Sequence, residues 1–496
     1  MPAILATPSP ADYIELTTGT GLATGAGAPS GNADALPTQR FGAGRLAAFA
    51  SLTMGVAAVE VPLGTYVPPL YASAFGFPLA TVGLIFLAAR LWDAVTDPAI
   101  GILSDRTRTR WGRRRPWIAT GAAVFVLGAV PVFLPPVWFG PVALTLSLFT
   151  LYLGYSMIAT PFSAWSGELS AQYHERTRIQ SFVMVMTALA LLLALVLPSL
   201  VAHRFAHEPR AQLAVMGAMV FALLAVTVPI GLNAVPEPPL AIAPQTPLRM
   251  GSTLRLVFGE GLLLRVIASN FAVRLAQGTR TALFVFFVGF YMGRPEWAPG
   301  LFLLQYIFGI MACPLWSAIG RRIGKGRAAV AGELTQVVIN LGLLFLTRGN
   351  VPLLLALTVA QGLAQGSGNL MLRAIVADVA DQHRLSTGED RIGLFYSVFA
   401  LSDKAGMAVA VGIALPLVAS LGFDPRHANA PLVLEHLKWV FAAGPALAHT
   451  ISALVVRGFP IDESRHNEIR RALAGRDAAG LTSDPRHERW LADDSN

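Results

Sequence analysis

The stretch Arg90–Trp117, RLWDAVTDPAIGILSDRTRTRWGRRRPW, decides the fold. It begins inside an apolar run of membrane-spanning length that carries two aspartates, Asp93 and Asp97, and it ends in a cluster of six arginines. A carboxylate in hydrocarbon costs roughly 2.5–3.5 kcal/mol on insertion scales, so two in one span need a purpose. The stretch therefore indicates a membrane helix with an ion path, followed by a basic loop at the membrane surface.

The composition indicates a polytopic membrane protein. Of 496 residues, 54% are hydrophobic and only 13% are charged, whereas a soluble globular chain has about 25% charged residues. The formal net charge of +8 comes from basic residues in short loops between apolar runs, which is typical of membrane topology and not of a nucleic-acid-binding face. The single cysteine, Cys313, excludes an intrachain disulfide and a cysteine-based metal site.

Twelve apolar runs are long enough to span a membrane, which takes about 20 residues. They cover residues 46–72, 80–104, 117–136, 140–166, 179–202 and 211–234 in the first half and 262–291, 298–319, 327–347, 351–377, 392–421 and 434–456 in the second. The predicted fold is all-α, with twelve transmembrane helices in two six-helix bundles. The predicted parts are a disordered cytoplasmic tail over 1–44, bundles over 45–234 and 262–456, a cytoplasmic connector over 235–261 between them, and a cytoplasmic tail over 457–496.

Lys and Arg in the short loops predict the orientation. Basic residues gather in alternate loops, at Arg106–Arg115, Arg176–Arg178, Arg321–Arg327 and Arg384–Arg391. These loops and both termini are therefore expected on the cytoplasmic side of the cell (inner) membrane. The loops DRTRTRWGRRR and GRRIGKGR follow the second span of each half, a weak internal symmetry that is typical of transporters built from repeats.

Asp93 and Asp97 lie four residues apart, so they share one face of a helix. With a rise of 1.5 Å per residue, Asp93 lies about 18 Å into a core of about 30 Å. Thr96 adds a hydroxyl, and oxygen ligands suit a hard cation such as Na⁺. The sequence predicts a cation site here. The alternative is that the carboxylates only neutralise a base on a neighbouring helix.

Lys404, in the eleventh span, lies at a similar depth and is the predicted partner of Asp93. Such a lysine is either one member of a static ion pair or a charge that is displaced when a cation binds. We favour displacement, which assigns Lys404 a coupling role. Asp403 beside it stays an unassigned carboxylate.

The end of the opening stretch predicts a second device at the inner surface. Asp105 lies at a helix end among arginines that are able to bind it in one conformation and release it in another. The predicted latch comprises Gly101, Asp105, Arg106, Arg113 and Arg114. The alternative is a basic anchor that only sets topology.

Other polar residues within spans are candidates for a substrate path. They are Glu60 and Tyr66 in the first span, Asn270 and Arg274 in the seventh, and Gln361, Gln365 and Asn369 in the tenth, where Arg373 continues the four-residue stripe. Such residues face a bundle interior or a water-filled cavity. Interhelical hydrogen bonding is an equally good interpretation of the stripe. Glu60 is either a second proton or cation site or a structural partner.

ARLWDAVTDPAIG followed by DRTRTRWGRRRPW resembles the second helix and following loop of the glycoside-pentoside-hexuronide:cation symporters, the melibiose-permease-like branch of the major facilitator superfamily. The resemblance covers most of residues 45–456, including TPFSAWSGEL and IVADVADQ. It implies two pseudo-symmetric bundles, alternating access, and coupling of Na⁺, Li⁺ or H⁺ through Asp93 and Asp97. Thr96 and Ser156 fall at or near further cation-site positions of that family.

The resemblance fails at the positions that hold a galactoside in melibiose-type permeases. Ala57, Ala159, Ser163 and Met184 stand there, and alanine and methionine offer no directional hydrogen bonds to a sugar. Another glycoside remains an option. The Na⁺-coupled lysolipid transporters of the same branch provide the alternative, because their substrates need apolar walls.

The expected function is cation-coupled symport of a small organic solute, a sugar or glycoside among the candidates, by a monomer in the lipid bilayer. The alternative is transport of a lysolipid or another amphiphile. An enzyme is not expected, because His203 and His207 lie in an outer loop without a clear third ligand. We expect no cofactor, no metal beyond a Na⁺ at Asp93 and Asp97, and no nucleic-acid partner. The sequence does not identify the substrate. It also leaves open whether the coupling cation is Na⁺ or H⁺ and whether the solute is imported or exported.

Overall fold

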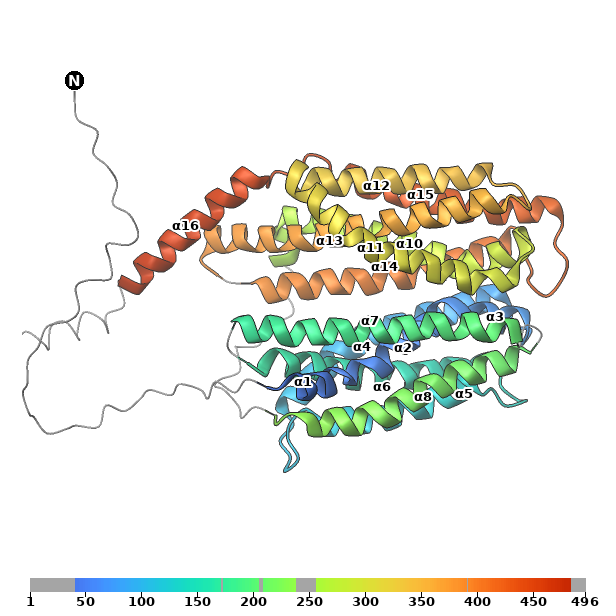
Figure 1. The fold of residues 1–496 in the computed structure, drawn as a ribbon, viewed down its shortest axis with the longest axis horizontal. Coiled ribbons are helices and arrows are strands. Elements are labelled where there is room, and N and C mark those ends of the chain that lie inside the picture. The colour runs from blue at the N-terminus through green and yellow to red at the C-terminus, as the bar shows by residue number, and fades with distance from the viewer. Residues whose placement is uncertain (1–40, 171–172, 205–207, 238–255, 390, 483–496) are drawn as a thin grey trace, which may run out of the picture. The chain divides into compact units, whose positions relative to one another are not determined.

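The computed structural model, drawn in Figure 1, describes residues 41–482 except 171–172, 205–207, 238–255 and 390. Nearly all of the predicted N-terminal tail, most of the connector and the end of the C-terminal tail therefore lie outside the described residues. The regular elements of the described part are helices, and extended backbone pairs there only in an isolated bridge between Thr109 and Gly112.

The first bundle contains eight α-helices and one π-helical turn. They are α1 (Ala43–Ala50), α2 (Leu52–Val61), the π-turn η2 (Pro62–Tyr66), α3 (Val67–Ser73), α4 (Leu79–Arg106), α5 (Arg115–Phe133), α6 (Pro141–Glu168), α7 (Tyr173–Arg204) and α8 (Pro209–Ala234). The first predicted span is broken, because α1 bends by 41° against Leu52–Ser73. Pro62 begins the π-turn within this span, where its missing N–H interrupts the helical ladder.

The second bundle repeats this arrangement. Its elements are α10 (Gly261–Phe286), the π-turn η3 (Phe287–Tyr291), the 3₁₀ turn η4 (Pro295–Trp297), α11 (Ala298–Ile323), α12 (Lys325–Gly342), the 3₁₀ turn η5 (Leu343–Phe345), α13 (Val351–Thr387), α14 (Ile392–Ser420) and α15 (Pro431–Val456). A further helix, α16 (Glu463–Thr482), follows, and it buries Ile469 and Leu473. The two residues are four apart and so share one face of α16.

Ten helices in the described part are long and apolar enough to cross a membrane, and the bent α1–α3 series makes an eleventh. The one predicted span that this set lacks is the tenth, residues 351–377, which is α13; its glutamines and glycines lower its mean hydropathy. It packs between α11 and α12 inside the second bundle. The prediction of a twelve-helix membrane fold in two bundles is confirmed, and the protein is a multi-pass membrane protein.

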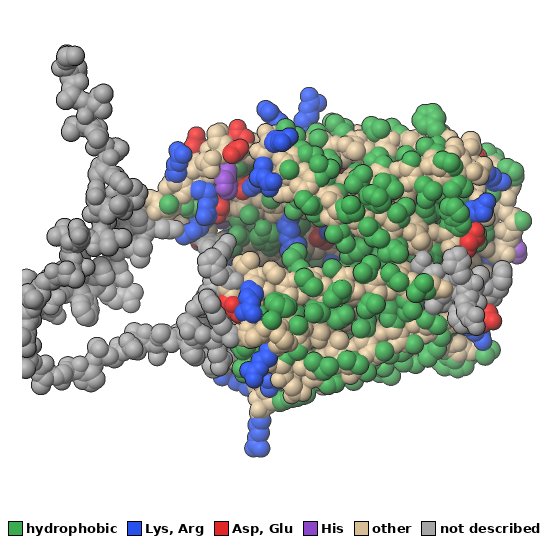
Figure 2. Space-filling model, viewed as in Figure 1, with side chains coloured by type: hydrophobic (Ala, Val, Ile, Leu, Met, Phe, Trp, Pro, Cys, Tyr) green, Lys and Arg blue, Asp and Glu red, His purple; other side chains and the backbone are tan. Residues whose placement is uncertain are grey.

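The two bundles meet along α4 with α14 and along α7 with α11. Contact is tightest between the first half of α4 and the last half of α14: a Cβ on Gly83 would lie 2.9 Å from Leu415 Cβ, and one on Gly412 would lie 2.6 Å from Leu87 Cδ2. At the other end, where α16 lies, Figure 2 shows a hollow between the bundles. The bundles are therefore closed at one end and open at the other.

Candidate functional site

An ion-pair cluster joins the two bundles where α4 meets α14. Lys404 Nζ donates a hydrogen bond of 2.8 Å to Asp93 Oδ2 and also contacts the Asp97 carboxylate. Lys404 comes from the second bundle and both aspartates come from the first. One ammonium thus bridges two carboxylates, and this bridge ties the bundles together.

Hydroxyl groups of α6 complete the cluster from the other side. Ser156 Oγ donates to Asp93 Oδ1 at 3.1 Å and lies 3.0 Å from Thr96 Oγ1. Thr160 Oγ1 donates to Asp97 Oδ1 at 3.3 Å. Ser156 and Thr160 are four residues apart, as are Asp93 and Asp97, so two matched hydroxyl–carboxylate pairs lie one helical turn apart.

The cluster combines a closed side and an open side. Only 1% of the Asp93 side chain is exposed, whereas Asp97 and Lys404 expose 29% and 27%. Lys404 bridges the two carboxylates, and Arg90 of α4 lies near enough to interact electrostatically with Asp93 and with Glu60. The cluster presents carboxylate and hydroxyl oxygens, which are the kind of ligand that suits Na⁺ or a proton.

Glu60 lies close to this cluster, in the first broken span. Its Oε1 accepts a 2.8 Å hydrogen bond from the Tyr155 hydroxyl, and the Glu60 side chain is exposed. Lys404 Nζ lies 6.0 Å from the centroid of the Tyr155 ring. Tyr155 therefore connects Glu60 with the lysine of the cluster. Tyr66, the other candidate in this span, is buried, and its hydroxyl has no hydrogen-bond partner among the described residues.

Asp403, which the sequence left unassigned, pairs with residues of α10. Arg274 Nε donates to Asp403 Oδ1 at 2.6 Å, and Asn270 Nδ2 donates to the same atom at 2.8 Å. Asn270 and Arg274 therefore hold a carboxylate next to Lys404 in sequence. The negative charge of Asp403 is therefore paired within the second bundle. Lys404 instead pairs with the aspartates of the first bundle.

The polar stripe of α13 makes interhelical hydrogen bonds. Gln361 Nε2 donates to Gln336 Oε1 of α12, and Gln365 Oε1 accepts from Gln305 Nε2 of α11, both at 2.6 Å. Gln361 is also buried, at 2% exposure. The Asn369 side-chain oxygen is buried without a hydrogen-bond partner among the described residues. These contacts favour the packing interpretation for the two glutamines.

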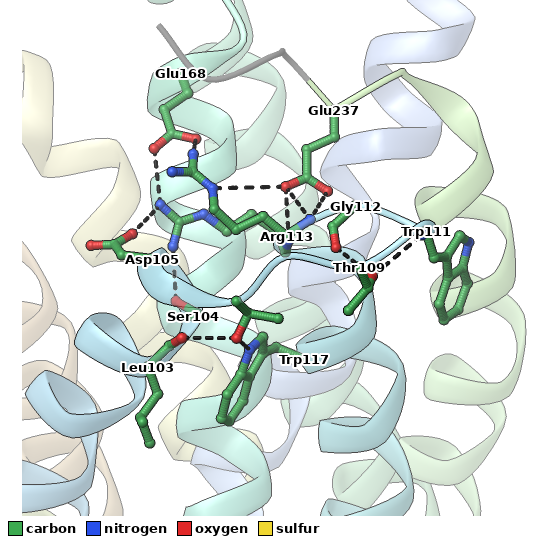
Figure 3. Close-up of polar contacts among 12 residues, drawn as sticks. Leu103, Ser104, Asp105, Thr109, Trp111, Gly112, Arg113, Trp117, Glu168 and Glu237 are labelled. Atoms are coloured by element: carbon green, nitrogen blue, oxygen red, sulfur yellow. Dashed lines mark hydrogen bonds and ion pairs between the residues drawn. The ribbon is translucent and has the colours of Figure 1, made fainter. Parts of the chain in front are cut away.

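Three of the predicted latch residues, Asp105, Arg113 and Arg114, belong to one ion-pair network at the end of the first bundle where α4 and α6 end, and Figure 3 labels Asp105 and Arg113 in it. Arg114 is 2% exposed, and its guanidinium binds Ser104 Oγ at 2.8 Å, Asp105 Oδ1 at 2.5 Å and Glu168 Oε1 at 2.9 Å. Arg113 pairs with Glu168 at 2.6 Å. These partners all belong to the first bundle.

Two further predicted latch residues lie at the edge of this network. Arg106 is exposed at the last position of α4, and Gly101 faces Thr160 of α6, whose Cγ2 would lie 3.6 Å from an added Cβ. The carboxylates of Glu168 and Glu237 were not identified from the sequence. Glu237 lies in PEP, directly after an apolar run, and this acidic residue at a span end is the one signal for it.

Glu237 binds the loop between α4 and α5 through the backbone. Its carboxylate accepts hydrogen bonds from the N–H groups of Arg113, at 2.9 Å, and Arg114, at 2.8 Å (Figure 3). Successive backbone N–H groups that point the same way form a concave anion site. Gly112 makes this approach feasible: its φ is +120°, and a Cβ there would lie 2.1 Å from Glu237 Oε2.

We therefore expect Gly112→Ala to lower the free energy of unfolding by about 1.5–3 kcal/mol, because it expels a carboxylate from two charge-assisted hydrogen bonds. Denaturant unfolding of the purified protein in micelles measures this loss. Gly140→Ala is the matched control, since Gly140 has a negative φ and nothing within 4 Å of an added Cβ. Equal stability of the two variants would show that Glu237 is not held this way.

Comparison with known proteins gives one family and one fold. The family model described as MFS/sugar transport protein matches residues 48–463. A putative glycoside/cation symporter of Escherichia coli is 26% identical over 421 residues, covering 82% of this chain and 90% of that protein. The human sodium-dependent lysophosphatidylcholine symporter 1 is 25% identical over 435 residues, covering 79% and 78%. The solved structure of a bacterial homologue of the iron transporter ferroportin, in an inward-facing state, shares the fold, with a TM-score of 0.61, 15% identity, and coverage of 84% of this chain and all of that one.

Proposed function

The chain belongs to the MFS/sugar transport protein family, and from that premise we propose that it is a cation-coupled symporter of a small organic solute. The observation that carries this proposal is the bridge from Lys404 in one bundle to Asp93 and Asp97 in the other. A ligand shifts a conformational equilibrium only through differential interaction with the two states. A cation that takes the aspartates from Lys404 acts directly on a contact between the bundles.

In this mechanism the cation binds among the oxygens of Asp93, Asp97, Thr96 and Ser156, with Thr160 as a further donor. The cation enters from the exposed side of Asp97 and displaces the Lys404 ammonium. The freed lysine then weakens the hold of α14 on α4, and the bundles rock about the site. The same two helices form the tight contact at Gly83 and Gly412, so the bridge and the closed end lie on one helix pair.

The basic loops support a cytoplasmic position for the open end. The loops after α4 and α11 carry Arg and Lys, and positively charged loops face the cytoplasm. The conformation is then inward-open, in the cell membrane, with both termini inside. The Arg114 network, as the proposed latch, holds the inner ends of α4 and α6 and the start of the connector in this state.

For the solute we favour a glycoside or another polyol. Glu60 and the Tyr155 hydroxyl are directional polar groups beside the coupling cluster, and hydroxyl groups of a sugar are able to satisfy both. The E. coli relative, described as a putative glycoside/cation symporter, supports this class. The second candidate is an amphiphile. It draws support from the human relative and from exposed apolar side chains on the two other helices at the bundle boundary, Met184 of α7 and Met311 of α11.

Uptake into proteoliposomes tests the proposal. Glycosides, sugar acids and lysolipids are offered with an inward Na⁺ gradient, an inward proton gradient, or neither. We expect one solute class to accumulate only with a cation gradient. Accumulation that is indifferent to both gradients would overturn cation coupling, and accumulation of lysolipid alone would replace the glycoside by the amphiphile.

Glu60→Gln tests the assignment of Glu60 to the solute. Loss of a charge-assisted hydrogen bond costs about 1.5–3 kcal/mol, so we expect KM for the solute to rise roughly tenfold or more. The cation concentration for half-maximal uptake should stay unchanged. Tyr155→Phe, which removes the hydroxyl that Glu60 binds, should raise KM in the same direction. A shift in cation dependence with an unchanged KM would instead make Glu60 a second cation site.

A further inference from the structure

A buried arginine in the second bundle has no carboxylate partner. Arg280 of α10 is 5% exposed, and in the described part of the chain no Asp or Glu oxygen lies within ion-pair distance of its guanidinium. It lies 11 residues before Tyr291, where the span ends, or about 16 Å at 1.5 Å per residue, which is near the middle of a core of about 30 Å. Arginine stays protonated in proteins, so its charge cannot be removed by loss of a proton.

The neighbours of Arg280 are neutral and leave part of its hydrogen-bonding capacity unused. Nη1 donates a long bond of 3.3 Å to Asn340 Oδ1 of α12, and the guanidinium lies 5.1 Å from the centroid of the Phe441 ring of α15. Nε has no partner among the described residues. The buried arginine of the first bundle is different: Arg114 contacts two carboxylates.

A chain of side-chain amides leads from Arg280 to a second buried polar group without a hydrogen-bond partner among the described residues, the side-chain oxygen of Gln361. Asn340 Nδ2 donates to the Gln336 carbonyl, and Gln336 Oε1 accepts from Gln361, whose own side-chain oxygen is buried without a partner among the described residues. These amides supply dipoles but no negative charge. An uncompensated charge in a low-dielectric interior is strongly unfavourable, and buried charges are normally paired.

We infer that Arg280 is the centre of an anion-binding site inside the second bundle, and that its ligand is a small monovalent inorganic anion such as chloride. The burial of Arg280 restricts the ligand to a small one. The free Nε–H and the weakly engaged Nη1 provide donors, and the amide of Asn340 is able to rotate to present its N–H₂ group. The bound anion links α10, α12 and α15 and supports the helix that carries Asn270 and Arg274.

The site is tested by the unfolding temperature of the full chain in micelles, with chloride replacing gluconate at constant Na⁺ and constant ionic strength. We expect chloride to raise the midpoint of the wild type saturably, by about 3 °C or more when it is in large excess over Kd. Sulfate, which is larger and divalent, should not replace chloride. A wild-type midpoint that is indifferent to chloride would overturn the inference.

Three variants locate the effect. Arg280→Gln and Asn340→Asp should both abolish the chloride dependence, the first by removing the charge and the second by placing a carboxylate beside it. Arg265→Gln is the matched control on the same helix, since Arg265 binds the backbone carbonyls of Val455 and Arg457, and it should keep the dependence. Full chloride dependence in Arg280→Gln would place the site elsewhere.

If Arg280→Gln does not fold, the anion site is tested instead by equilibrium binding of radioactive chloride to the wild type. One saturable site per chain, absent in Asn340→Asp, supports the site, and no saturable binding overturns it. Neither result depends on transport, so a failure here is distinguishable from a failure of the proposed symport.

Discussion

Replacement of Asp93 by asparagine is expected to reduce gradient-driven uptake by about a hundredfold or more. The neutral amide removes a carboxylate that binds Lys404 on one oxygen and Ser156 on the other, in surroundings that expose only 1% of the side chain. Charge-assisted hydrogen bonds contribute about 1.5–3 kcal/mol each, and every 1.4 kcal/mol is a factor of ten in binding. The neutral amide also offers a cation one negative charge fewer, so in the proposed mechanism coupling is lost at ordinary cation concentrations.

The measurement separates coupling from folding and from solute binding. Proteoliposomes with the Asp93→Asn variant are assayed for accumulation driven by a cation gradient and for equilibrium exchange of labelled solute without a gradient. We expect the first to be lost and the second to survive without cation dependence. Asp97→Asn should behave in the same way, since Asp97 contacts the same lysine and Thr160.

Asp424→Asn is the matched control. Asp424 lies in the loop between α14 and α15, where Arg426 lowers the pKa of its carboxyl to about 2. It is an ionised carboxylate outside the membrane, and its replacement should leave coupling intact. Cation-dependent accumulation at the wild-type level in both Asp93→Asn and Asp97→Asn would remove the aspartates from the mechanism.

The positions of the coupling residues followed from helix geometry alone. Counting at a fixed rise placed Asp93 and Lys404 at equal depth on different spans, and the two side chains contact each other in the structure. The same count showed that Asp93 and Asp97 share a face. Their role as a cation site stays a prediction, because a contact is not a function.

The residues that the sequence did not identify could be recognised only from the register between neighbouring helices. Tyr155 and Thr160 are ordinary residues of an apolar run until α6 is placed against α2, where Tyr155 meets Glu60, and against α4, where Thr160 meets Asp97. Glu237 is recognised only when the backbone of the α4–α5 loop is known. The partners of the α13 stripe also depend on tertiary packing, because amides on α11 and α12 bind glutamines that the sequence offered as candidates for a solute path.

Lys404→Ala distinguishes a static ion pair from a displaceable charge, and it is the second change with a large expected effect. In the proposed mechanism the lysine competes with the cation for both carboxylates, so its removal should make the cation bind at least roughly tenfold more tightly, equivalent to about 1.4 kcal/mol. Accumulation should nevertheless fall by about tenfold or more, because without a cation the two aspartates are left without the ammonium that bridges them. That state hinders the return of the empty carrier.

Cation binding is measured by the Na⁺ or proton concentration that raises the unfolding temperature without solute, and accumulation is measured in proteoliposomes with the same preparation. Lys438→Ala is the matched control, since Lys438 is likewise a lysine in an ion pair, but it pairs with Glu435 on its own helix, within one bundle. It should leave both quantities near the wild-type level. Lys404→Arg keeps the positive charge and should retain part of the coupling. A Lys404→Ala variant with wild-type cation affinity and wild-type accumulation would mean that the bridge between the bundles is static, and the cation would then have to act on some other contact to move them.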